Sequence, residues 1–123
     1  MKHGELTEKI IGAAFDVSNE LGNGFIESVY EKALLISLRE RGIHAESQKP
    51  LQVFFHEQAV GKFVADVIVE DEIILELKAV KTIAPEHIAQ VINYLKATGL
   101  EVGLLLNFGK RRLEYRRFNN HCD

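Results

Sequence analysis

Residues 102–108 constrain the fold more than any other part of the sequence, because they read as a continuous apolar run. A strand with apolar residues on both faces is typical of the inside of a sheet that helices cover on both sides. A helical pattern precedes this run, opening at Pro85 and closing at Gly99. Strand-like segments come before that helix, so the helix would cross from one strand to another. We therefore predict an α/β protein in which helices flank one central mixed sheet.

The other elements follow from the spacing of apolar residues and from turn residues. Helical spacing predicts helices at about 6–21, 26–41 and 85–98. Strand patterns occur at 43–49, 51–55, 58–69, 72–80, 102–108 and 113–118, of which 43–49 is the weakest and 113–118 reads as an edge strand. Turns are expected at His56–Glu57 and Glu70–Asp71, and both Pro50 and Pro85 would lie at element boundaries.

Length and composition indicate one soluble domain. The chain has 123 residues, of which 46% are hydrophobic and 27% are charged, ordinary values for a globular domain. We expect the domain to cover 1–118 and a short C-terminal tail to cover 119–123. Residues 1–8 are mostly polar and charged, no apolar run approaches the roughly 20 residues of a membrane span, and Cys122 is the single cysteine. These features favour a cytoplasmic protein that does not interact with membranes.

Positive charge is concentrated near the C-terminus. The chain carries a net charge of −3, yet residues 110–118 contain five basic residues and one acid. That segment therefore carries +4 and the rest of the chain −7, with the basic residues at Lys110, Arg111, Arg112, Arg116 and Arg117. Such a basic strip is able to bind a phosphate backbone, or it is simply a solvated hairpin tip.

Three polar residues in otherwise apolar strands suggest chemistry. Glu76 and Lys78 are two residues apart, so they share one face of their strand. Asp66 interrupts the apolar run 63–69, and a short turn at Glu70–Asp71 would bring it beside Glu76. Two neighbouring carboxylates repel each other unless a cation lies between them, and Mg²⁺ binds carboxylates together with water and phosphate oxygens. The alternative is a Glu76–Lys78 salt bridge on a solvated sheet face.

These residues carry a resemblance to a known family. Asp66, followed after a hairpin by Glu76-Leu77-Lys78, resembles the Asp…Glu-x-Lys signature of the PD-(D/E)xK nuclease superfamily. The spacing of Gln90 and Tyr94 is similar to the Gln-x-x-x-Tyr of its exonuclease-type branch, and the segment 24–30 resembles the GxxExxY pattern that names a family of small members. One departure is Ala65, which stands where the name-giving proline often occurs.

The resemblance implies a restriction-endonuclease-like fold and a role for each matching residue. Asp66 and Glu76 would bind Mg²⁺ or Mn²⁺ together with the backbone carbonyl of Leu77, and Lys78 would be the catalytic lysine. Glu27 would be the helix acid that supports the metal and the reaction. Substrate would be bound by Gln90, Tyr94 and Tyr30 and, from the basic strip, by Arg112 and Arg116. We also expect Glu27, Gln90 and Tyr94 to converge on the face of the sheet that carries Asp66, Glu76 and Lys78.

Simpler explanations remain for several of these residues. Glu27 could merely suit the first turn of a helix, Tyr30 and Tyr94 could be core aromatics, and Gln90 could be an exposed helix residue. The predicted function is a metal-dependent nuclease that hydrolyses phosphodiester bonds, with DNA favoured over RNA as substrate. The alternatives are an inactive nucleic-acid- or protein-binding module with the same fold, and a subunit whose grip on substrate comes from a second copy or a larger partner protein.

Overall fold

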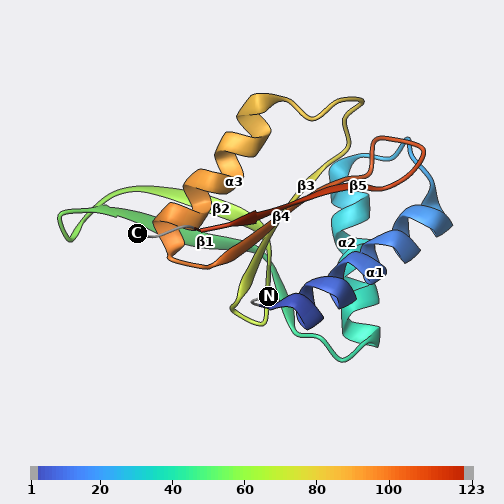
Figure 1. The fold of residues 1–123 in the computed structure, drawn as a ribbon, viewed down its shortest axis with the longest axis horizontal. Helices are drawn as coiled ribbons and strands as arrows, with labels where there is room; N and C mark the ends of the chain where they lie inside the picture. Colours follow the sequence, from blue (N-terminus) through green and yellow to red (C-terminus); the bar gives the residue numbers. More distant parts are fainter. Residues whose placement is uncertain (1–2, 121–123) are drawn as a thin grey trace.

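The computed structural model describes residues 3–120, which form a five-stranded mixed sheet with three helices (Figure 1). The elements in chain order are α1 (Gly4–Leu21), α2 (Glu27–Glu40), β1 (Ala45–Phe55), β2 (Gln58–Val69), β3 (Ile73–Lys78), α3 (Pro85–Thr98), β4 (Val102–Asn107) and β5 (Glu114–Asn119). This confirms the predicted fold class. None of the helices within 3–120 is long and apolar enough to cross a membrane, and Cys122 lies outside the described residues.

The strands are arranged in the order of the chain, β1-β2-β3-β4-β5. All neighbouring pairs are antiparallel except β3 and β4, which run parallel because α3 crosses over between them. Helices α1 and α2 cover one face and α3 covers the other (Figure 1). All six residues of β4 are buried, as the apolar run predicted. Gly103 allows α3 to pack closely here, because a Cβ at this position would lie 2.8 Å from Cγ1 of Val91.

Most element boundaries lie within two residues of the prediction, as in β3, which ends at Lys78 where the strand was expected to reach residue 80. Two differences change the description of the fold. β1 is one continuous strand through Pro50, where we expected two strands and a break. It is an edge strand that pairs only with β2, and on an edge the missing N–H of proline costs no bond to a second neighbour. The expected domain boundary after residue 118 falls inside β5, which ends at Asn119. Asn120 then donates hydrogen bonds to the carbonyls of Leu95 (3.0 Å) and Leu100 (3.2 Å), so the described part of the expected tail is attached to the fold.

The side chains of β2 change faces at Asp66. Phe63 and Ala65 pack on the α3 side, whereas Val67 and Val69 pack on the side of α1 and α2. Residues two apart in a regular strand share a face, so the strand is irregular at Asp66. The pairing of β2 with β3 also extends only from Val69 to Val67. Asp66 therefore lies where β2 separates from β3.

The neighbouring strand is irregular at the same level. Gln48 of β1 lies opposite Asp66, between the pairs Ser47–Val67 and Lys49–Ala65. Its backbone has φ 51°, a left-handed conformation that is uncommon for a residue other than glycine. Beyond this level β1 and β2 continue as a two-stranded hairpin that extends past the sheet (Figure 1). The hairpin is held by α3, since Phe63 stacks on Tyr94 with ring centroids 4.0 Å apart.

Candidate active site

Two carboxylates meet where β2 separates from β3. Extending the β2–β3 register by one residue beyond Val67–Leu75 sets Asp66 opposite Glu76. The Oδ2 atom of Asp66 accepts a hydrogen bond of 2.8 Å from the backbone N–H of Leu77. The Asp66 side chain thus supplies the acceptor that a regular strand partner would have provided, and this bond fixes it beside Glu76 as the turn at Glu70–Asp71 predicted.

Glu76 is a buried acid with an unsatisfied oxygen. Its side chain is 3% exposed, and the alternation of β3 directs it towards α3, away from Leu75 and Leu77. Its Oε1 atom has no hydrogen-bond partner among the described residues. The pKa of Glu76 is raised to about 9, first by burial and then by the hydrogen bond with Asp66 and the charge of Asp66, while the charge of Lys78 opposes the shift.

This arrangement fits a divalent cation. A buried oxygen without a donor, beside a second carboxylate, is stabilised when a cation lies between the two groups. No cluster of three or more His, Cys, Asp or Glu side chains within 3–120 has a metal-binding arrangement. Two carboxylates are nevertheless enough for Mg²⁺, which completes its coordination with waters and substrate oxygens.

Lys78 lies on the same face of β3 as Glu76 and is partly buried. Its charge lowers the pKa of Glu76, so the two side chains interact electrostatically. No ion pair joins Lys78 to an acid among residues 3–120. The salt bridge between Glu76 and Lys78 that the sequence left open is therefore not formed, and the ammonium group remains available to a phosphate or a water.

Helix α3 brings two of the predicted residues to the site. The Nε2 atom of Gln90 donates a 2.7 Å hydrogen bond to the hydroxyl of Tyr94. Burial raises the pKa of Tyr94, and the charges of Glu76 and Asp66 raise it further, while the bond from Gln90 opposes the shift. Tyr94 therefore lies close enough to both carboxylates to sense their charge, although its ring also packs on Phe63.

Helix α2 approaches the site from the opposite side, so the expectation of a single face is wrong. Tyr30, Leu34 and Leu38 pack α2 on the face that α3 does not cover. Glu27 lies in the first turn of this helix and is exposed. The carboxylates at the strand separation are thus approached by α2 on one side and by Gln90 and Tyr94 on the other.

Glu31 of α2 is a further acid near the carboxylates, and no sequence motif indicated it. Its Oε1 atom accepts a 2.7 Å hydrogen bond from Nε2 of Gln48, the residue opposite Asp66. Partial burial raises the pKa of Glu31, and the charges of Asp66 and Glu27 add to the shift while Gln48 opposes it. The available signal was its spacing, because residues four apart share a helix face and Glu31 follows Glu27 by four.

Tyr30 has a structural position. Its side chain is 0% exposed, and its ring stacks on Phe108 with centroids 4.7 Å apart. Its hydroxyl donates to the carbonyl of Gly22 (2.6 Å) and accepts from the N–H of Phe25 (3.2 Å). These contacts hold the turn before α2 and leave no exposed surface for a substrate, so the expected contact with substrate does not fit this position.

Part of the basic strip shares the site's face of the sheet. The register places Glu76, Leu105 and Arg116 in one row across β3, β4 and β5. Arg116 is exposed and lies two strands, or about 10 Å, from Glu76. Arg112 is exposed in the preceding loop and borders a cavity of about 550 Å³ with Lys110 and Arg111.

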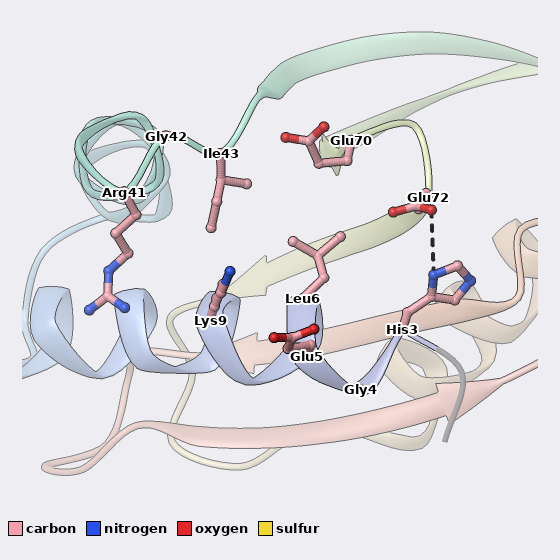
Figure 2. Close-up of a pocket in the computed structure, with 10 residues that line it drawn as sticks. All are labelled: His3, Gly4, Glu5, Leu6, Lys9, Arg41, Gly42, Ile43, Glu70 and Glu72. Carbon is pink, nitrogen blue, oxygen red and sulfur yellow. Dashed lines mark ion pairs between the residues drawn. The ribbon is translucent and has the colours of Figure 1, made fainter.

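A second cavity lies away from these residues. It has a volume of about 600 Å³ and lies beside the start of α1, the segment after α2 and the β2–β3 turn (Figure 2). Acidic and basic side chains line it, and His3 forms an ion pair of 3.6 Å with Glu72 at its edge. None of the predicted site residues lines this cavity, so the candidate site is identified by its carboxylates.

Comparisons with known proteins agree with this fold. Residues 4–118 match the family described as the PD-(D/E)XK nuclease superfamily. A solved structure titled "Crystal structure of SSO0001" is similar, with a TM-score of 0.62 and 20% sequence identity. The similarity covers 98% of this chain and 61% of that one, so this chain spans about three fifths of that protein, and at this identity the likeness supports the fold alone. A comparison with curated proteins found no match.

The first prediction concerns the stability of the metal-free protein. Because the pKa of Glu76 rises from 4.5 to about 9 on folding, the folded state holds this proton more tightly than the unfolded state. The contribution of Glu76 to stability is therefore fully present below the unfolded pKa and is lost as the pH rises towards the folded value. With a chelator present, Glu76→Gln should lose less stability than the wild type between about pH 5 and about pH 9. Thermal unfolding across this range measures the difference, with the exposed change Glu20→Gln as control, and parallel curves for Glu76→Gln and wild type would contradict it.

Proposed function

Because the chain belongs to the PD-(D/E)XK nuclease superfamily, we propose that it is a metal-dependent nuclease that hydrolyses phosphodiester bonds in nucleic acid, with DNA favoured over RNA. The observation that supports this most directly is the unsatisfied Oε1 of buried Glu76 beside the carboxylate of Asp66. We also assign the chain to the GxxExxY branch, on the positions of Gly24, Glu27 and Tyr30. The nuclease-like domain would take up nearly the whole chain.

In this proposal Asp66 and Glu76 hold Mg²⁺ or Mn²⁺, with the backbone carbonyl of Leu77 as a further ligand and Glu27 as the supporting acid from α2. The bound ion would supply positive charge to the scissile phosphate and make an attacking water more acidic. Glu76 must release its proton to act as a ligand, since only the ionised carboxylate binds metal well. The raised pKa of Glu76 therefore couples binding of the ion to release of a proton.

The remaining residues act on the substrate. The ammonium group of Lys78, which forms no ion pair within 3–120, orients the attacking water or balances the charge of the phosphate. Gln90 and Tyr94 form a hydrogen-bonded pair that orients the substrate from the α3 side. Arg112 and Arg116 bind the phosphate backbone. Because Asp66, Glu76 and Lys78 are all present, we favour an enzyme over an inactive binding module with the same fold.

The second prediction concerns the metal. Asp66→Ala removes one of the two carboxylates, so it should weaken Mn²⁺ binding by at least about tenfold, as even the loss of a group that only orients a ligand commonly does. Titration calorimetry on the wild type, Asp66→Ala and the exposed control Glu20→Ala measures this. Equal affinity in all three proteins would show that Asp66 holds no ion.

The third prediction separates the chemistry of Lys78 from its packing. Lys78→Ala should abolish divalent-dependent cleavage of oligonucleotides, because it removes the charge that acts on the phosphate. The thermal midpoint should stay within a few degrees of the wild type, since Lys78 forms no ion pair within 3–120. Lys96→Ala, an exposed lysine of α3, is the matched control. A folded Lys78→Ala protein with full activity would contradict the assignment.

The fourth prediction concerns the grip on substrate. Each phosphate contact contributes about 0.9 to the slope of log K against log salt on duplex DNA. Arg112→Ala/Arg116→Ala should therefore bind duplex more weakly and with a slope smaller by up to about 1.8. Binding would be measured in Ca²⁺ to suppress cleavage. Lys9→Ala/Arg39→Ala, at exposed positions of α1 and α2, is a double control that removes the same charge outside the basic strip. An unchanged slope would mean that a second copy or a partner protein supplies the grip.

A further inference from the structure

Asn107 is a fully buried polar residue at the end of β4, inside the run that the sequence presented as apolar. In the parallel register it lies beside Lys78 of β3. The next residue, Phe108, donates its N–H to the carbonyl of Lys78 at 2.8 Å. Asn107 and Lys78 are thus the last pair in the register of β3 and β4, and Lys78 is the residue assigned to catalysis.

The side chain of Asn107 extends that pairing by one further residue. Its Oδ1 atom accepts from the N–H of Val80 at 3.0 Å, and its Nδ2 atom donates to the carbonyl of Val80 at 2.9 Å. The amide therefore binds both groups of Val80, as the backbone of a neighbouring strand would. Oδ1 also accepts from the N–H of Gly109 (3.0 Å), and Nδ2 donates to Oε1 of Glu114 (3.2 Å). All four hydrogen-bonding positions of the amide are then used.

The surrounding contacts hold Val80 from a second direction and connect it to the basic strip. A Cβ at Gly109 would lie 2.3 Å from the backbone N and O of Val80, so the two backbones are in close contact. Glu114, which accepts from Asn107, also pairs with Lys110 at 3.4 Å. The segment 79–84 that follows Lys78 has no regular secondary structure, so Asn107 provides the first anchor after the strand.

We propose that Asn107 is a positioning residue for Lys78: by holding Val80 as a strand partner would, it fixes the backbone after Lys78 and so keeps the ammonium group beside Glu76. Because the lysine side chain is long and flexible, the position of its ammonium group depends on where the backbone of Lys78 is held. The catalytic part of this inference rests on the proposed nuclease function. The positioning part concerns the protein alone and is tested without turnover.

The kinetic test uses Asn107→Asp, which keeps the shape of the side chain but removes both N–H donors and faces a negative charge towards the Val80 carbonyl and Glu114. We expect kcat for cleavage of an oligonucleotide with Mn²⁺ to fall by about tenfold to a hundredfold, as for a small misplacement of a catalytic group. KM and oligonucleotide binding in Ca²⁺ should stay near those of the wild type. Asn19→Asp, the same change at an exposed position of α1, is the control. A folded Asn107→Asp protein with unchanged kcat, or with a change in KM alone, would overturn the proposal.

The second test needs no activity. In the wild type, hydrogen exchange of the Val80 amide should be as slow as that of amides within β3, although Val80 lies outside the strand. In Asn107→Asp, the NMR signals of the Lys78 side chain should shift, and in Asn19→Asp they should not. Fast exchange at Val80 in the wild type would overturn the proposal even if Asn107→Asp fails to fold. A wild type that cleaves no nucleic acid but shows both NMR results would refute the proposed function and leave the positioning role in place.

Discussion

The candidate site depends on one hydrogen bond, from the backbone N–H of Leu77 to the carboxylate of Asp66. When β2 separates from β3, this N–H loses its strand partner, and Leu77 is buried. An unpaired buried N–H is costly, so the fold requires an acceptor here, and Asp66 provides it. The same bond holds Asp66 against Glu76, whose pKa is raised to about 9. In the metal-free protein a proton relieves this repulsion, and a divalent cation could relieve it in the proton's place.

On both sides of β3, a side chain takes over hydrogen bonding where the backbone pairing with the neighbouring strand ends. On the β2 side, Asp66 pairs with Leu77 where the antiparallel ladder has ended. On the β4 side, Asn107 pairs with Val80 where the parallel ladder has ended. Residues 76–78, which carry the Glu-x-Lys motif, lie between these two points. The strand that carries the motif is thus held by a side chain on each side, at the level where its backbone pairing ends.

The features that depend on local spacing could be predicted from the sequence. Apolar periodicity gave the type and order of the helices and strands, and strand alternation with the Glu70–Asp71 turn brought Asp66 to Glu76. Features that depend on tertiary position could not be predicted. Pro50 appeared to break a strand, because its edge position is not visible in the sequence. The irregular backbone at Asp66 and at Gln48 opposite it is not visible in the sequence. The position of Glu31 near Asp66 therefore could not be predicted. Asn107 was read as part of an apolar run, because only the structure shows that Val80 needs its amide.

The distribution of charge suggests how such a small acidic domain holds a polyanion. The register of β5 directs Glu114 and Arg116 to the face of the sheet that carries Glu76. Tyr115 points to the α1 face, where its ring centroid lies 6.1 Å from that of Phe15. Strand alternation directs Arg117 to the same face as Tyr115, and Lys110 forms an ion pair with Glu114. Only part of the positive charge of the basic strip can therefore contact a substrate beside the carboxylates. Two phosphate contacts are far fewer than the roughly six to ten that give strong salt-dependent binding to duplex DNA. If Arg112 and Arg116 are the whole grip, the isolated domain binds weakly, and efficient cleavage would need further contacts from a second copy or a larger partner protein.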